Sequence, residues 1–520
     1  MKSVEIFLAI FIIPLFGICQ DFENRFTTDI DRSGENYSVY EVGQKIVGVR
    51  STRKKIISNN REGEFFILNE ELQPETQITF PMPDHQEFQW ADIFGPELVL
   101  LSHYSLKVIQ STIDELTIIS INSESGQLSM IPFRSSELSE VTDFHSFGMN
   151  SLVLGRNAAG LMLQSVDHLQ PENVNRKLLF DNSFELLSAN KQNDANSLIV
   201  LARKKDAQQN DLLHMVTVSP KGEIIEKGTF DLLEDKRTNY RTLLATDFKG
   251  DKVYSGVFGP RNNYHSSGLI NIFINEFEEF SLWRSYLNDL PGFFDEHDST
   301  IPFGKKKRMD RRVKTGRIPY LKETLELWGL ETSENGVWHH FEQFGSQLKS
   351  ESDYQRSFIE SFTKKNKYFA GNRFSRELPL VPGAYKDRTR PYRLSSEYIA
   401  YAAHLIHLNE MQEIIHYHRI PLSATMQFLP TASGALSQDQ DKIIYAYFDG
   451  KDILCSYFEN EKTKYLNKKI PFDHDQKTVE LSSIKVRFDQ NGKLLVSGKG
   501  RLKDEEGSRK TAFFIERYSF

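Results

Sequence analysis

Apolar and polar residues follow one another along this chain in a unit that recurs roughly every 45 to 55 residues. In each unit a polar turn leads into an apolar strand, a polar loop follows, and a second apolar strand ends in another turn. The first of the two strands begins at Ile46, Leu98, Leu152, Leu198, Val253, Val337, Ile443 and Leu494. The second strand follows at Phe65–Leu68, Leu116–Ile121, Leu161–Val166, Leu212–Val218, Leu269–Ile274, Tyr398–Leu408, Ile453–Phe458 and Ala512–Ile515. This pattern predicts an all-β fold.

Units of this length, with four short strands each, are typical of the blades of a β-propeller. One four-stranded sheet cannot bury both of its faces alone, whereas sheets arranged radially bury them against each other. Eight units favour eight blades, although the short third unit leaves seven open. We therefore expect a β-propeller of seven or eight four-stranded blades, forming a single domain over residues 20–520. A pair of β-sandwiches and an irregular all-β fold are the alternatives.

The two ends of the chain bear on how such a ring would close. The chain ends inside a strand, Thr511–Tyr518, which leaves the last blade without an outer strand. Closure would require the segment after Asp21 to pair with that blade. Several units also end on a proline that follows an apolar residue, at Pro81, Pro132, Pro421 and Pro471. Proline has no N–H group to donate, so these positions suit outer strands.

The spacing of the units and the hairpins around Val253–Ile274 and Tyr398–Leu422 carry a resemblance to known proteins. In these features most of the chain resembles uncharacterised exported bacterial proteins with β-propeller-like repeats. The resemblance implies the fold without implying an activity. Separately, Thr332–Trp338 resembles the Asp-box turn of sialidase propellers, but Glu334 replaces the aspartate and Trp338 stands one residue early. No sialidase activity is inferred from it.

The first twenty residues have the pattern of an export signal. The apolar run Ile6–Ile18 suits the core of a signal peptide and is short for a membrane span. Gly17 and Cys19 are small residues placed for cleavage before Gln20. We expect residues 1–19 to be a signal peptide, with acylation of Cys19 or a retained anchor as alternatives. No later stretch is long and apolar enough to span a bilayer, so the expected location is the periplasm, the cell surface or the exterior.

Composition narrows the kinds of partner. The formal net charge is −7, so no overall positive charge points to nucleic acid, and none is expected as a partner. The 38 Phe and 20 Tyr favour strands over helices. Loss of Cys19 with the signal would leave Cys455 as the one cysteine. An exported chain without a disulfide relies on its core, which favours a bacterial envelope or exterior.

Two basic insertions interrupt the repeat, over residues 287–322 and 344–393. The first contains a dense run of cations at Lys305, Lys306, Lys307, Arg308, Arg311 and Arg312. Like charges this dense repel each other, which favours a solvated loop or a short surface helix over a polyanion site. In the second insertion, aromatic residues four apart predict an amphipathic helix over Asp353–Lys365. Insertions in adjacent units of a regular scaffold indicate its functional rim.

Histidines are the first candidates for chemistry. On a strand, His339 and His340 point to opposite faces, whereas His416 and His418 share a face. The spacing supplies no further ligands for a tetrahedral metal site, so we expect no metal and outward-facing imidazoles on an edge strand. The chain has no Gly-x-Ser-x-Gly elbow, no His-Glu-x-x-His motif and no glycine-rich phosphate loop. No cofactor is expected.

These observations favour a binding or scaffold protein over an enzyme. The expected ligand is a protein or a glycan, held on the rim that carries the insertions. The candidate binding residues are Lys305, Lys306, Lys307, Arg308, Arg311, Arg312, His416 and His418. An envelope hydrolase with a loop-built site at the propeller funnel is the alternative, because Ser, His and Asp occur in most units. A structural or assembly role in the envelope is the third possibility.

Overall fold

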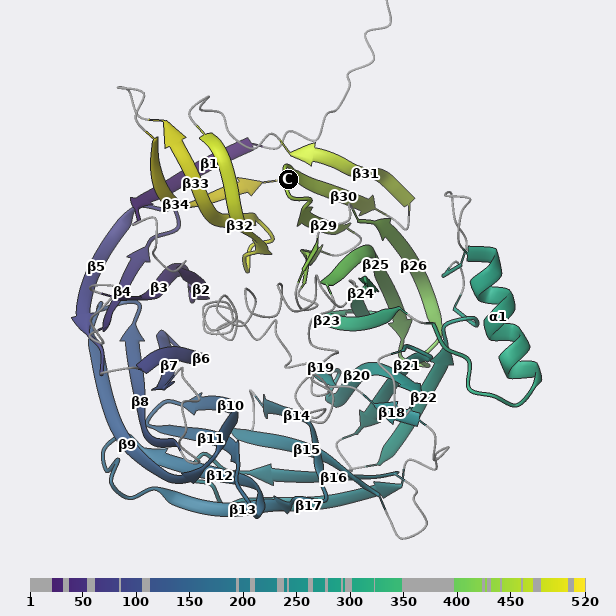
Figure 1. Ribbon diagram of the computed structural model, residues 1–520, viewed down its shortest axis with the longest axis horizontal. Coiled ribbons are helices and arrows are strands. Elements are labelled where there is room, and N and C mark those ends of the chain that lie inside the picture. The colour runs from purple at the N-terminus through teal and green to yellow at the C-terminus, as the bar shows by residue number, and fades with distance from the viewer. Residues whose placement is uncertain are drawn as a thin grey trace, which may run out of the picture.

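The chain forms a ring of eight antiparallel sheets, as the computed structural model in Figure 1 shows. The prediction of a β-propeller is therefore confirmed, with eight blades. The structure describes residues 21–519 except for 31–36, 54–60, 84–85, 105–112, 193–195, 206–210, 232–237, 241–242, 261–264, 276–278, 291–292, 295–301, 322, 348–396, 423–425, 428–431, 440–441, 460–461, 471–477 and 504–508. The predicted signal peptide and the predicted helix over Asp353–Lys365 lie outside these described residues.

The first four blades follow one another without interruption. Blade 1 contains β2 (Ser38–Val42), β3 (Lys45–Arg53), β4 (Arg61–Leu68) and β5 (Pro74–Pro81). Blade 2 contains β6 (Gln86–Phe94), β7 (Glu97–Tyr104), β8 (Ile113–Asn122) and β9 (Leu128–Leu138). Blade 3 contains β10 (Glu140–Phe147), β11 (Asn150–Arg156), β12 (Gly160–Asp167) and β13 (Asn175–Asp181). Blade 4 contains β14 (Glu185–Gln192), β15 (Ser197–Lys205), β16 (Asp211–Val218) and β17 (Ile224–Asp231).

The last four blades include the interrupted units and the closure. Blade 5 contains β18 (Thr238–Tyr240) and β19 (Leu244–Phe248), both paired with β20 (Asp251–Pro260), then β21 (Gly268–Ile274) and β22 (Phe280–Tyr286). Blade 6 contains β23 (Thr324–Ser333), β24 (Gly336–Gln347), β25 (Glu397–Asn409) and β26 (Ile414–Pro421), with β27 (Met426–Gln427) also on β25. Blade 7 contains β28 (Gly434–Asp439), β29 (Lys442–Phe448), β30 (Ile453–Glu459) and β31 (Lys462–Ile470). Blade 8 contains β32 (Thr478–Phe488), β33 (Leu494–Lys503), β34 (Arg509–Ser519) and β1 (Asp21–Asp29).

Within each blade the strands run from the axis outwards, so that β6 and β10 lie near the centre of Figure 1 and β9 and β13 at its perimeter. The two apolar strands predicted for each unit are the second and third strands of the blade. On β7, Leu98 and Leu100 pack toward blade 1, whereas Val99 and Leu101 pack toward blade 3. Because a neighbouring blade covers each face, the run Leu98–Leu101 is apolar at every position instead of alternating.

Every seam between neighbouring blades contains one large apolar cluster, including the seam between blades 8 and 1. The ring closes as predicted, because β1 is the outer strand of blade 8 and pairs antiparallel with β34. On β1, Phe26 is buried and its ring centroid lies 4.7 Å from that of Phe66 in blade 1. The N-terminal strand thus joins the last blade to the first.

The prolines lie where their missing N–H group predicts. Pro471 lies outside the described residues. Pro81 and Pro421 end the outer strands β5 and β26, and Pro132 lies within the outer strand β9. No neighbouring strand of the same blade lies outside them to require their N–H. The sequence pattern therefore predicted correctly which strands lie at the perimeter.

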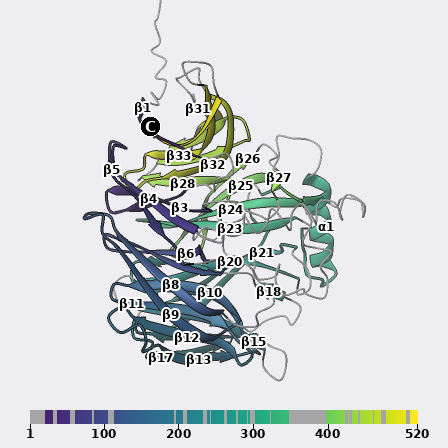
Figure 2. The ribbon, with the colours of Figure 1, turned by 60° about the vertical axis from the view of Figure 1, so that its left-hand side comes forward.

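The first insertion contains α1 (Pro302–Lys314), which is the only helix among the described residues. Two views show α1 outside the ring, next to blades 5 and 6 (Figure 1, Figure 2). The second insertion separates β24 from β25. Since β24 continues to Gln347, the insertion begins four residues later than the sequence pattern suggested. The described part of the chain has no helix long and apolar enough to cross a membrane.

Candidate functional site

The cationic run of the first insertion folds as α1, the surface helix that was one of the two expected forms. One side of the helix faces the ring. Met309 on that side is fully buried and belongs to the apolar cluster at the seam of blades 5 and 6, together with Leu287, Leu290 and Leu321. A methionine at this position supplies the apolar contact that a helix needs for stable packing.

Two of the predicted binding cations help to hold the helix in place. Lys305 and Arg312 lie on the same side as Met309, at positions i, i+4 and i+7. The Lys305 ammonium lies 2.6 Å from the carboxylate of Glu323. Arg312 donates a hydrogen bond of 2.8 Å to the carbonyl of Ile318, and its guanidinium lies 4.2 Å from the ring centroid of Tyr320.

The C-terminus of α1 ends in a Schellman motif. Gly316, with φ +65°, donates to the carbonyl of Val313, and Arg317 donates to the carbonyl of Arg312. The Thr315 hydroxyl also donates to the carbonyls of Arg311 and Arg312. Glycine reaches this left-handed conformation without the steric cost of a Cβ, so the sequence ends the helix here.

The opposite side of α1 carries an exposed set of cations, called here the basic stripe. Its members are Lys306, Lys307, Arg308, Arg311 and Lys314, all exposed. Among the described residues, no hydrogen bond or ion pair engages their side chains. The structure therefore brings four of the predicted binding residues together on one surface, while Lys305 and Arg312 face the ring.

The other two predicted binding residues do not join this surface. His416 and His418 lie half-buried on β26, and their rings stack 6.0 and 6.1 Å from the ring of Trp338. His418 also stacks 4.1 Å from Phe458 of blade 7. The expectation of outward-facing imidazoles is wrong, because the side chains turn into the seam of blades 6 and 7. The intervening Tyr417 packs on the other face, toward α1 and blade 5.

The predicted separation of His339 and His340 holds. His339 shares a hydrogen bond of 2.9 Å with Ser255 of blade 5, whereas His340 lies 3.3 Å from Glu342 and against Tyr445 of blade 7. Burial lowers the pKa of His339 to about 4. Glu342 is fully buried and accepts hydrogen bonds from the Ser433 backbone amide and the Tyr445 hydroxyl. These groups therefore hold blades 5, 6 and 7 together.

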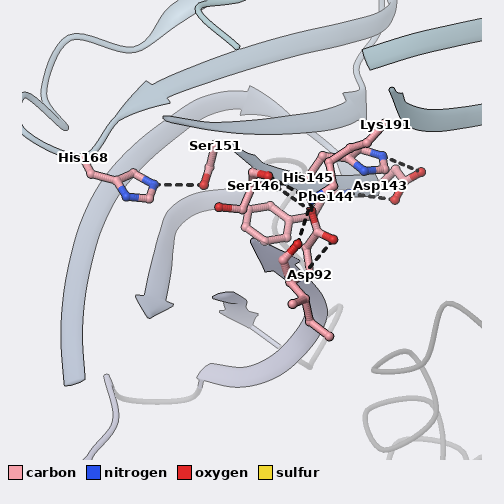
Figure 3. Close-up of polar contacts among 9 residues, drawn as sticks. Asp92, Asp143, Phe144, His145, Ser146, Ser151, His168 and Lys191 are labelled. Carbon is pink, nitrogen blue, oxygen red and sulfur yellow. Dashed lines mark hydrogen bonds and ion pairs between the residues drawn. The ribbon is translucent and has the colours of Figure 1, made fainter. Parts of the chain in front are cut away.

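A polar cluster on the inner strands of blades 2, 3 and 4 was not predicted (Figure 3). The Lys191 ammonium lies 2.7 Å from the Asp92 carboxylate and donates to the backbone carbonyls of Ile93 and Ser146. The same Asp92 oxygen accepts the Ser146 amide at 2.7 Å. The sequence signal was the carboxylate of Asp92 between apolar residues of β6, but nothing in the sequence placed Lys191 beside it.

The same cluster contains an imidazole and a carboxylate on one strand. His145 Nε2 lies 3.2 Å from Asp143 Oδ2 on β10, and the His145 side chain is only 5% exposed. Nearby, the Ser151 hydroxyl shares a hydrogen bond of 2.9 Å with His168, but Ser151 is fully buried. In the first pair the imidazole is buried, and in the second the hydroxyl is buried. No group of three or more His, Cys, Asp or Glu in the described residues could hold a metal ion.

Comparison with known proteins gives matches of fold only. No protein-family model and no curated protein matches the chain. Among solved structures, the β-propeller domain of the trilobed protease from Pyrococcus furiosus, which has an open velcro topology, matches at 8% identity and a TM-score of 0.34, over 84% of this chain and 99% of that one. The polysaccharide lyase Uly1 matches at 8% identity and a TM-score of 0.40, over 95% and 99%. A protein from Lactobacillus plantarum matches at 8% identity and 0.39, over 82% and 95%. Matches at this level carry no conclusion about activity.

Proposed function

We propose that this protein is a binding or scaffold propeller whose basic stripe on α1 contacts an anionic macromolecule. The observation that carries the proposal is that one side of α1 packs against the ring while the other side exposes its cations to solvent. Met309, Lys305 and Arg312 hold the helix against the ring, while the five cations of the basic stripe remain exposed. The helix has seven basic side chains and one acidic side chain, in a chain of net charge −7. A local positive patch on an acidic protein attracts anions selectively.

The connectivity of blade 6 supports a shared binding face. Thr324, which begins β23 after the first insertion, pairs with Phe344 near the end of β24. Gln347 and Glu397, which bound the second insertion, pair with each other at the same edge of the sheet. Both insertions therefore attach to one edge of the same blade. The second is also basic in sequence, with Lys364, Lys365, Lys367, Arg373, Arg376, Lys386, Arg388 and Arg390.

The imidazoles favour binding over the hydrolase alternative. A hydrolase needs a nucleophile or a general base that a substrate can reach. In the pairs Asp143–His145 and Glu342–His340 the imidazole is buried, with 5% and 4% of the histidine side chain exposed. Each imidazole lies on the same strand as its carboxylate, and Glu342 also accepts a hydrogen bond from Tyr445 of blade 7, so this carboxylate has a structural role.

We also propose that the protein is exported and that mature molecules begin at Gln20. The proposal rests on the apolar run Ile6–Ile18 and on the small residues Gly17 and Cys19, which are placed for cleavage before Gln20. The proposed location is the periplasm, the cell surface or the exterior.

The test of binding is chromatography of the mature protein on immobilised heparin and on immobilised poly-L-glutamate, with elution by salt. The variant Lys307→Glu/Arg311→Glu should elute at much lower salt and bind at least about tenfold more weakly, since two attractive charges become repulsive. The matched control is Lys221→Glu/Lys227→Glu, which changes two exposed lysines near the outer strand of blade 4. Equal weakening by both variants, or by neither, would refute a role for the basic stripe.

A further inference from the structure

We infer that the ligand of the basic stripe is an extended acidic polysaccharide, and this inference rests on the proposed function above. Three features of the described part of α1 and its surroundings lead to it: the spacing of the exposed cations, the lack of an apolar anchor among them, and the engagement of both faces of the nearby Tyr320 ring. Each favours a linear chain of repeated anionic groups over a folded acidic protein or a neutral glycan.

The spacing of the cations follows the helix axis. Lys307, Arg311 and Lys314 occupy positions i, i+4 and i+7, so they form a row along one side of α1. With a rise of about 1.5 Å per residue, neighbouring members of the row are separated by about 6 Å and about 4.5 Å along the axis. Such a row matches a chain whose anionic groups recur once per sugar residue. A compact anion would engage one or two of the cations and leave the rest unused.

The stripe lacks the apolar groups on which protein interfaces depend. Binding energy between proteins concentrates in buried aromatic and apolar anchors, and lysine is depleted from the interface core. Within residues 305–314, Val313 is the one large apolar side chain with substantial exposure, at 45%. A surface that offers cations but no apolar anchor suits a flexible polyanion, because such a ligand gains affinity from many weak ion pairs.

The nearby aromatic ring is not free to stack on a sugar. Tyr320 carries the Arg312 guanidinium over its ring at 4.2 Å, and the His265 ring stacks on it at 4.7 Å with an interplanar angle of 18°. Two partners thus occupy the ring that could otherwise form an apolar platform for a neutral sugar. Recognition at this surface therefore depends on charge.

The lysines near the N-terminus of α1 destabilise the free helix, whereas Arg311, Arg312 and Lys314 in its last turn favour it. The first turn has no acidic residue, and Lys305, Lys306 and Lys307 lie near the positive end of the helix macrodipole. Lys307 and Arg311 form a like-charge i, i+4 pair, which opposes the helix further. A bound polyanion would relieve both effects. The contacts of Met309, Lys305 and Arg312 keep the row ordered before the ligand arrives, which lowers the entropy cost of binding.

The experiment is calorimetric titration of the mature protein with four probes: polygalacturonate, chondroitin sulfate, poly-L-glutamate and dextran. We expect binding to at least one acidic polysaccharide that is tighter than binding to poly-L-glutamate, and no binding to dextran. Affinity for oligogalacturonates should rise with chain length until the row is covered. Lys307→Glu/Arg311→Glu should lose at least tenfold in affinity while its thermal midpoint stays near that of the unmodified protein, and Lys221→Glu/Lys227→Glu should bind normally.

The possible failures separate the two proposals. Tighter binding of poly-L-glutamate than of either acidic polysaccharide, lost in the α1 variant, overturns the glycan inference and leaves the proposed binding function standing. Equal binding of dextran overturns the inference, because charge would then be unnecessary. Failure of all three anionic polymers to bind, or binding that the α1 variant does not weaken, overturns both.

Discussion

The Lys191 ammonium of blade 4 reaches past blade 3 to lie 2.7 Å from the Asp92 carboxylate of blade 2. Both side chains are largely enclosed, with exposures of 11% and 1%. On the way Lys191 also donates to the carbonyl of Ser146 on the intervening blade. One side chain therefore links the inner strands of three consecutive blades (Figure 3).

We predict that Lys191→Met strongly destabilises the protein. It would remove the cation that lies 2.7 Å from the buried Asp92 carboxylate, and breaking a buried pair in this way costs about 3 kcal/mol or more. Asp92→Asn should also destabilise, and the double variant should cost less than the sum of the two because the residues share one interaction. Urea unfolding would measure these changes. Additive effects in the double variant would show that the two side chains are not coupled.

The second prediction concerns the contribution of Phe26 on β1 to the closure of the ring. Phe26→Ala should lower the free energy of unfolding by about 3 kcal/mol or more, because the ring is buried against Phe66 in the first blade. Thr27→Ala, at an exposed neighbouring position of β1, is the control and should change stability by less than about 0.5 kcal/mol. If Phe26→Ala proves as mild as the control, the N-terminal strand contributes little to closure.

A third prediction concerns acid. Burial lowers the pKa of His339 to about 4 and that of His404 to about 3, below the unfolded value of about 6.5. The unfolded chain therefore binds more protons, so stability is complete above about pH 6.5 and declines as the pH falls toward 4. The buried His407 and the half-buried His418, whose pKa values burial lowers to about 4, should add to this decline.

His404→Gln tests that explanation. His404 is fully buried, hydrogen-bonded to the Tyr417 hydroxyl at 2.7 Å and to Gln343 at 3.2 Å. Glutamine keeps hydrogen-bonding groups at this position but does not titrate, so the loss of thermal stability from pH 7 to pH 5 should be smaller than in the unmodified protein. An identical pH profile in the variant would assign the acid sensitivity to other groups.

The fourth prediction concerns export. Expressed with its full N-terminus in a secreting bacterium, the protein should be recovered outside the cytoplasm with Gln20 as its first residue and without lipid. Intact-mass spectrometry of the recovered protein would check both points. A diacylglyceryl group on Cys19 would establish the lipoprotein alternative instead.

The candidate site could be predicted in part. The run Lys305–Arg312 was visible as a dense group of cations, and its charge is what keeps most of these side chains in solvent. The run itself does not show which of these cations face the ring. Lys305 and Arg312 do so because Met309 packs into the seam, Glu323 pairs with Lys305, and Tyr320 lies against Arg312. His416 and His418 were assigned correctly to one face of a strand, but that face is covered by blade 7.

The sequence by itself determined the repeat, the strands and the closure of the ring, because these follow from local periodicity. A run such as Leu98–Leu101 is apolar at every position only if both faces of its sheet are covered, and the three strands β32, β33 and β34 need a fourth strand to complete their blade. The tertiary structure alone decided which polar side chains meet across the seams. Asp92 and Lys191 belong to blades that are not adjacent, and their contact depends on the radius and twist of the whole ring, which no local pattern encodes.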